Sequence, residues 1–102
     1  MAKKSLDPLT EPMFYVLLSL YRKELCGADI SSYVQELTDG RVRLGPGTLY
    51  TMLSLFQKEK LIFKVFSEGR RITYGITPEG KELYENEVRR RRKCLSDAEM
   101  NE

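Results

Sequence analysis

The sequence predicts a mainly α-helical domain with a small β-hairpin, arranged as a winged helix-turn-helix and followed by a further helix at the C-terminus. Two observations predict this fold. A helix-forming stretch begins at Pro46, which suits the first turn of a helix. Behind it, two stretches rich in β-branched and aromatic residues, 61–68 and 72–77, flank the short connection Gly69-Arg70-Arg71.

Composition limits the classes of function. At 102 residues the chain is one domain, and no apolar run approaches the roughly 20 residues that a membrane span needs. The polar start, residues 1–5, lacks the pattern of a signal peptide. Two cysteines that are far apart, and the absence of histidine, exclude the usual zinc spacings and most histidine-based catalysis. We therefore expect a reduced, cytoplasmic protein that is not an enzyme and uses no metal or cofactor.

The first helix is expected to begin after a cap at Thr10 and to run to about Arg22. Its apolar residues form two faces about 100° apart, although a surface helix needs only one buried face. The first face consists of Met13, Val16, Leu17 and Leu20; the second consists of Phe14, Leu18 and Tyr21. Either the C-terminal helix or a partner chain should cover the second face.

A second helix is expected over residues 28–37, after a break at 25–27 and before the stop signal at 38–40. Ile30, Tyr33, Val34 and Leu37 recur at helical spacing and should pack inward. The helix is net acidic, so we do not expect it to lie along phosphates over its whole length. Residues 41–44 are too few for a helix and fit a brief strand beside the hairpin.

The third helix occupies the stretch 45–60 and has two contrasting faces. Leu49, Met52, Leu53 and Phe56 form an apolar stripe that should face the core. The opposite face carries small hydroxyl residues, a tyrosine tip and a cation, but no acid. Such a face can enter a groove and donate hydrogen bonds to phosphates and base edges. The simpler alternative is an amphipathic helix whose hydroxyl groups are merely solvated.

Positive charge gathers on the third helix and the hairpin. Between Arg41 and Gly75 there are seven Lys or Arg residues and two acids, a net charge of +5, whereas the whole chain has only +2. A local excess of this kind is typical of a surface that faces nucleic acid.

The last helix should begin at the cap Thr77, continue through Pro78 and run to about Leu95, which leaves 96–102 as a polar, acidic tail. Its first half is acidic and its second half holds the cation run 89–93. This division suits the helix dipole and would also suit two such helices packed antiparallel. The run is either a solvated or dimer-facing end or a DNA contact. Cys94 beside it is either an ordinary exposed thiol or a redox-active one.

Several short motifs are shared with a known family. They are Gly47-Thr48-Leu49-Tyr50 with Leu53 and Leu55, Leu61-Ile62, Arg70-Arg71, Tyr74, Thr77 and Gly80, together with Leu9-Thr10 and Gly27. In this combination, which spans roughly residues 9–84, the sequence resembles the PadR family of bacterial and archaeal transcriptional regulators. One departure is that Glu59-Lys60 stands where a glycine is usual in the turn before Leu61. The resemblance implies a DNA-binding regulator, in most cases a repressor.

These observations assign candidate residues. The expected DNA contacts are Thr48, Thr51 and Ser54 for base edges, Tyr50 for a phosphate or for packing on the wing, Lys58 and Lys64 for electrostatic attraction, and Arg70 and Arg71 for phosphates or the minor groove. The expected dimer interface contains Phe14, Leu18, Tyr21, Leu83, Tyr84 and Val88. Residues 1–77 would form the DNA-binding part and residues 78–102 the dimerisation helix and tail.

The expected partners are double-stranded DNA with a palindromic operator and a second copy of the chain. Similar PadR proteins sense signals, in some cases planar aromatic compounds at the dimer interface, so the resemblance allows a small-molecule inducer there. Ordinary packing explains the aromatic residues of the expected interface helices equally well. The alternative is a winged-helix protein-interaction module that does not bind DNA. The basic hairpin tip argues against that alternative.

Overall fold

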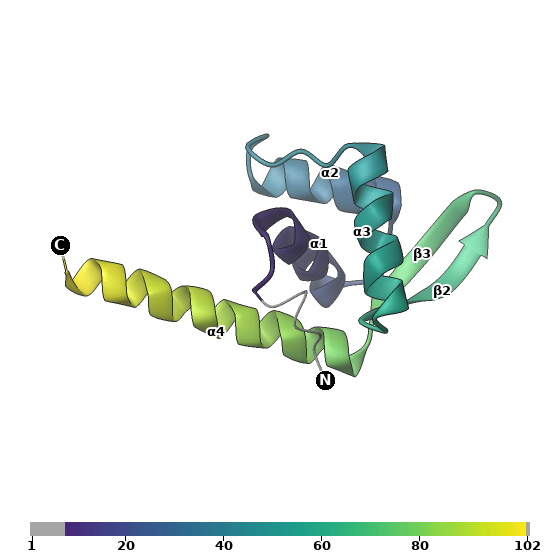
Figure 1. Ribbon diagram of the computed structural model, residues 1–102. Coiled ribbons are helices and arrows are strands. Elements are labelled where there is room, and N and C mark those ends of the chain that lie inside the picture. The colour runs from purple at the N-terminus through teal and green to yellow at the C-terminus, as the bar shows by residue number, and fades with distance from the viewer. Residues whose placement is uncertain (1–7, 102) are drawn as a thin grey trace.

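The computed structural model describes residues 8–101; the polar start 1–5 and the terminal Glu102 considered above lie outside them. The described residues form α1 (Glu11–Arg22), β1 (Leu25–Cys26), α2 (Gly27–Leu37), α3 (Pro46–Lys58), β2 (Ile62–Glu68), β3 (Arg71–Ile76) and α4 (Pro78–Met100). The hairpin β2–β3 projects on one side of the body, and α4 extends away on the other (Figure 1). The predicted helical fold with a β-hairpin wing is confirmed.

Local capping explains where the outer helices begin. The Thr10 hydroxyl accepts a hydrogen bond of 3.3 Å from the Met13 amide at the start of α1. The Thr77 hydroxyl accepts one of 3.0 Å from the Gly80 amide at the start of α4. In each case a side-chain oxygen satisfies an amide that has no partner within the helix.

The core lies where the inner faces of α1, α2 and α3 meet the sheet. Its fully buried side chains include Val16 and Leu17 from α1, Ile30 and Val34 from α2, Leu53 and Phe56 from α3, and Leu61 and Ile62 at the start of the wing. The predicted stripe of α3 is buried as expected, which turns the opposite face of this helix toward solvent. Leu37, which was expected to pack inward, is instead 48% exposed, because it lies on the last turn of α2.

The sheet is antiparallel with the order β1-β3-β2. Leu25 pairs with Tyr74 and Cys26 with Thr73, so the third strand is 25–26 and the predicted strand at 41–44 is wrong. The alternation of that segment has another cause: Val42 and Leu44 lie in the loop between α2 and α3 and bury their side chains in the core, and the Val42 amide donates to the Thr38 hydroxyl at 3.0 Å. Because alternate residues are buried, the segment has the alternating apolar pattern that is typical of a β-strand.

The end of α3 and the start of α4 are joined by a close backbone contact. The Thr77 amide donates to the Leu61 carbonyl at 3.0 Å, and the Thr77 hydroxyl donates to the Lys60 carbonyl at 2.8 Å. A Cβ atom on Gly80 would lie 2.2 Å from the Leu61 oxygen, so no side chain fits there. Lys60 has a φ of 63°, the left-handed conformation that favours the glycine expected at this turn.

Helix α4 differs from the prediction in length and in coverage. It continues to Met100, so the segment 96–100 that was expected to be a frayed tail is helical. Leu83 is buried against the body, so it belongs to the core and offers no surface to a partner chain. Among residues 8–101 no helix is long and apolar enough to cross a membrane.

Candidate nucleic-acid interface

The outer face of α3 presents the side chains that were expected to contact bases. Thr48, Thr51, Ser54 and Lys58 are all exposed, and the helix has no acidic residue in its first turn. Because the buried stripe fixes the rotation of α3, these four side chains share one solvent-facing side of the helix. Hydroxyl groups and an ammonium group on such a face can donate hydrogen bonds to phosphate oxygens and base edges.

The wing, which is the β2–β3 hairpin, supplies cations beside this face. Strand register places Glu68 opposite Arg71, so the turn consists of Gly69, with φ 61°, and Arg70. Lys64 and Arg70 are exposed and have no ion pair among the residues that the structure describes. They are therefore available to a polyanion.

Arg71 differs from Arg70, although the sequence suggested the same role for both. It is the first residue of β3, and its Nη2 lies 3.1 Å from Asp29 Oδ2 in the first turn of α2. The side chains of the pair are 61% and 51% exposed. Arg71 therefore already has an anionic partner, which the sequence analysis missed because the two residues are 42 positions apart.

Tyr50 lies where α3, α2 and the wing meet. A Cβ atom on Gly27 would stand 2.6 Å from the Tyr50 hydroxyl, so the ring occupies space that only glycine leaves open. A hollow of about 230 Å³ beside it is lined by Cys26, Gly27, Ala28, Tyr50, Arg70, Arg71 and Ile72. The hydroxyl end of the ring packs on Gly27 in the first turn of α2, and the ring shares the lining of this hollow with the two arginines of the wing. Gly27 was noted in the family motif, but its contact with Tyr50 could not be read from the sequence.

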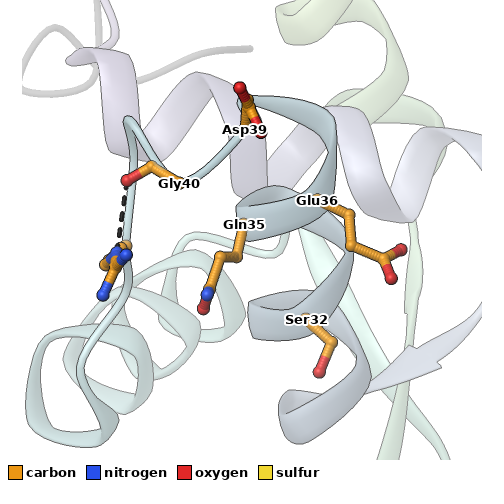
Figure 2. A pocket seen from close by; sticks show the side chains of 6 residues that line it. Ser32, Gln35, Glu36, Asp39 and Gly40 are labelled. Atoms are coloured by element: carbon orange, nitrogen blue, oxygen red, sulfur yellow. Dashed lines mark hydrogen bonds between the residues drawn. The ribbon is translucent and has the colours of Figure 1, made fainter.

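Arg41 and Arg43, two of the seven cations between residues 41 and 75, make contacts away from α3 and the wing. Arg41 Nη1 lies 2.7 Å from Glu11 Oε2, and its Nη2 donates to the Tyr15 hydroxyl at 3.1 Å. Arg43 Nε donates to the Gly40 carbonyl at 3.2 Å, and both residues line the hollow shown in Figure 2. That hollow, of about 480 Å³, is lined by Ser32, Gln35, Glu36, Asp39, Gly40 and Arg43. Its two acids make it a poor phosphate site.

A cluster of aromatic rings covers the second face of α1 from within the chain. The Tyr84 ring of α4 stacks on Phe14 with centroids 5.3 Å apart and lies 4.6 Å from Tyr21. The Tyr21 hydroxyl donates to Glu85 at 2.5 Å, which raises the pKa of that tyrosine. The C-terminal helix or a partner chain was expected to cover the second face of α1. The structure shows that the C-terminal helix packs against this face. A hollow of about 490 Å³ beside the rings is lined by Tyr21, Tyr84, Glu85, Val88, Arg89 and Arg92.

The cation run 89–93 is largely bound within the chain. Glu87 is buried, and its carboxylate accepts from Arg90 Nη2 at 2.6 Å and from Arg91 Nε at 2.7 Å. Arg91 also donates to the Leu9 carbonyl at 2.9 Å and lies 4.7 Å from the centre of the Phe14 ring. Burial alone would raise the pKa of the Glu87 carboxyl, but the two guanidinium groups outweigh it and the pKa is lowered.

Comparison with known proteins identifies the family. Residues 16–86 match the sequence pattern of the transcriptional regulator PadR-like family. The chain belongs to this family. Membership confirms the expectation of a regulator rather than an enzyme.

Solved structures share the fold. A transcriptional regulator from Clostridium thermocellum is 24% identical, with a TM-score of 0.76 over 97% of this chain and 96% of that chain. Bacillus subtilis PadR in complex with operator DNA is 22% identical, with a TM-score of 0.67 over 79% of this chain and 48% of that chain.

A curated relative is similar in sequence. An uncharacterised 37.1 kDa protein in transposon TN4556 of Streptomyces fradiae is 33% identical over 73 residues, which are 72% of this chain. This chain spans only 21% of that relative's length, so the likeness concerns one part of a larger protein.

Proposed function

We propose that this PadR-like protein is a cytoplasmic transcriptional repressor that binds duplex DNA sequence-specifically as a homodimer. The observation that carries the proposal is the acid-free, exposed face of α3 beside Lys64 and Arg70 of the wing, which have no ion pair among the described residues. The structural likeness to a PadR protein seen with operator DNA supports the same function.

In the proposed complex α3 is the recognition helix and lies in the major groove. Thr48, Thr51 and Ser54 contact base edges, while Lys58 and Lys64 approach phosphates. Arg70 at the tip of the wing contacts a phosphate or enters the minor groove, and the hydroxyl of Tyr50 donates to a phosphate. This assignment retains the predicted DNA-contacting residues except Arg71. The charge of Arg71 is already paired with Asp29.

We assign dimerisation to α4 and to Leu18 and Tyr21 on the second face of α1, which remain partly exposed. Leu95 and Met100 are 60% and 81% exposed on the distal half of α4, and Leu18 and Val88 are half-buried. Apolar side chains left in this way on a long helix favour pairing with a second copy. A two-fold dimer carries two recognition helices, so the operator half-sites should lie one helical turn apart or a multiple of it. Residues 1–77 then read DNA, and 78–102 set the spacing.

The hollow beside Tyr21 and Tyr84 is where we place a small-molecule inducer. Its aromatic walls suit a planar aromatic compound, and it lies at the proposed dimer interface. An inducer bound there would act on the angle between the two recognition helices rather than on the DNA surface itself.

Selection of bound fragments from random duplex DNA, followed by titration at several salt concentrations, tests the proposal. If about four phosphates are contacted per subunit, the slope of log affinity against log salt should be roughly −7 for a dimer. A recovered palindrome would fix the operator. A slope near zero, or no binding to any duplex at low salt, would show that the chain is not a DNA-binding regulator.

A specific feature of β2 favours the alternative function, a protein-interaction module without DNA binding. Phe63, Val65 and Phe66 on this edge strand are 39–57% exposed, and exposed apolar side chains of this kind can contact another protein. The same salt titration separates the two functions, because an apolar interface would give no steep salt dependence.

A further inference from the structure

The first turn of α2 contacts both parts of the proposed DNA-binding surface. Gly27 provides the space that the Tyr50 ring of α3 occupies. Two residues further along, Asp29 holds Arg71 of the wing. One turn of helix, itself outside the expected set of DNA contacts, therefore lies between the recognition helix and the wing.

The wing needs such a support because the sheet narrows toward its tip. Strand β1 pairs only with Thr73 and Tyr74, so beyond Thr73 the wing consists of β2 and β3 alone. A two-stranded ribbon twists strongly and is only marginally stable without further packing. Among the hydrogen bonds and ion pairs of residues 8–101, the Asp29–Arg71 pair is the one that ties residues 66–71 to the body.

The pair has a charge pattern that an affinity contact would not have. Asp29 is an exposed carboxylate beside a surface proposed to meet phosphates, where it repels DNA and neutralises a wing arginine. A residue that weakens attraction to every DNA sequence can still improve discrimination if it holds the wing in one orientation.

Resting on the proposed function, we propose that Asp29 is a positioning residue: through Arg71 it fixes the wing relative to α3. Arg70 is then the cation that contacts DNA, and Arg71 acts through Asp29. Exposed ion pairs are weak, so the pair shifts the population of wing orientations by a factor of roughly 2 to 5. The Asp29–Arg71 ion pair therefore contributes to sequence specificity. A wing that can reorient would contact the phosphates of any DNA sequence equally well.

Matched variants separate the roles of the two arginines. Arg70→Gln removes a phosphate contact, so it should flatten the salt slope of a dimer by about 2 units and weaken selected and scrambled duplexes alike. Arg71→Gln should leave the slope nearly unchanged. It should lower the ratio of selected to scrambled affinity by roughly two- to fivefold.

Asp29→Asn should change non-specific DNA affinity in the opposite direction to Arg70→Gln. It should tighten binding to scrambled duplex, because a repulsive charge is lost and Arg71 is released, while the ratio of selected to scrambled affinity falls. The double variant Asp29→Arg with Arg71→Asp restores the ion pair in reverse and should recover most of that ratio. A role in folding alone would not produce this recovery.

A measurement without DNA completes the experiment. ¹⁵N relaxation of the Gly69 amide reports the motion of the wing tip in the free protein. The order parameter should fall in Asp29→Asn and in Arg71→Gln, stay unchanged in Arg70→Gln and recover in the swapped pair. An unchanged Gly69 amide in both single variants overturns the proposal. So does an Arg71→Gln slope as flat as that of Arg70→Gln.

The two readouts distinguish this proposal from the function on which it rests. If wild-type protein binds no duplex, the proposed function fails, and the relaxation of Gly69 still decides whether Asp29 positions the wing. If DNA binding is steep in salt but Gly69 is indifferent to Asp29, the function holds and the positioning role is wrong.

Discussion

Two stretches of this chain are rich in arginine and lysine, and the structure treats them differently. Around α3 and the wing, Lys58, Lys64 and Arg70 are exposed and lack an anionic partner among the described residues. On α4, Arg90 and Arg91 converge on the buried carboxylate of Glu87, while Lys93 lies 3.3 Å from Asp97. The density of positive charge is therefore a poor guide to function, and the partner of each cation is a better one.

The comparison also shows what each group of charges can contribute. Unpaired exposed cations attract a polyanion, and the effect depends on salt. Cations that satisfy a buried carboxylate contribute to folding, because their loss leaves a charge without compensation. The first group should therefore affect DNA affinity and the second group should affect stability.

The largest expected effect is on DNA affinity. In the proposed dimer, replacing Lys58, Lys64 and Arg70 together with Gln would remove six phosphate contacts. The salt slope should then fall by about 5 units and affinity by at least about 100-fold at physiological salt. Thermal stability should stay nearly unchanged. Fluorescence anisotropy with the selected duplex measures the affinity.

The matched control removes the same charge from the other stretch. Replacing Arg89, Arg92 and Lys93 with Gln should change affinity by less than about threefold, because charges more than a Debye length of about 8 Å from the DNA are screened. An equal loss in both triple variants would remove the distinction between the stretches. Sedimentation of the second variant would then show whether the run 89–93 acts through dimerisation or through DNA contact.

The next effect concerns Arg91. Its replacement by Ala deletes a hydrogen bond to the Leu9 carbonyl, half of the pairing of Glu87 and the contact with the Phe14 ring. We expect a loss of about 2 kcal/mol in the free energy of unfolding, measured by urea denaturation. Arg92→Ala, on an exposed position of the same helix, is the control and should change it by less than about 0.5 kcal/mol. Equal losses would mean that the pairing of Glu87 contributes little.

A smaller effect separates backbone strain from charge within the exposed stretch. Lys60 has a left-handed backbone, so Lys60→Gly should stabilise the fold by about 0.5–1 kcal/mol. Lys60→Ala removes the same charge but keeps a Cβ atom, so it should bring no gain. Denaturant midpoints of the two variants decide the matter. A gain shared by both would assign the effect to the charge.

The smallest effect is the acid dependence that comes from Glu87. Its pKa is lowered in the folded state, so its contribution to stability is complete above the unfolded pKa of about 4.3 and is lost as pH falls through the folded pKa. Unfolding measured from pH 6 down to pH 3 should therefore show a loss that Glu87→Gln lacks. A parallel decline in both proteins would exclude a role for this carboxylate in acid unfolding.

The sequence predicts the helices and the wing well because their signals are local. Caps at Thr10 and Thr77, Pro46 at the start of α3 and the glycine turn at 69 act within a few residues. The strand at 25–26 could not be anticipated, since two residues carry no periodicity. The segment 41–44 was wrongly predicted to be a strand. Its apolar residues alternate because Val42 and Leu44 are buried in the core, not because the segment belongs to a sheet.

In the candidate site, too, features with local sequence signals were predictable and features that depend on distant contacts were not. Exposure of the α3 face follows from its apolar stripe, so the predicted residues are on the surface. The pairing of Arg71 with Asp29 and of Arg91 with the Leu9 carbonyl joins residues 42 and 82 positions apart, and no local pattern encodes it. Distant contacts of this kind decide which cations remain available.

The close approach of Gly80 to the Leu61 carbonyl fixes the start of α4 at the end of α3. A helix of 23 residues is about 35 Å long, so each degree of tilt about this point moves the far end by about 0.6 Å. The same ratio works in reverse: a displacement of several ångströms at the distal turns re-aims α3 by only a few degrees. In the proposed homodimer, large displacements of the distal turns of α4 would therefore correspond to small changes in the orientation of the surface proposed to contact DNA.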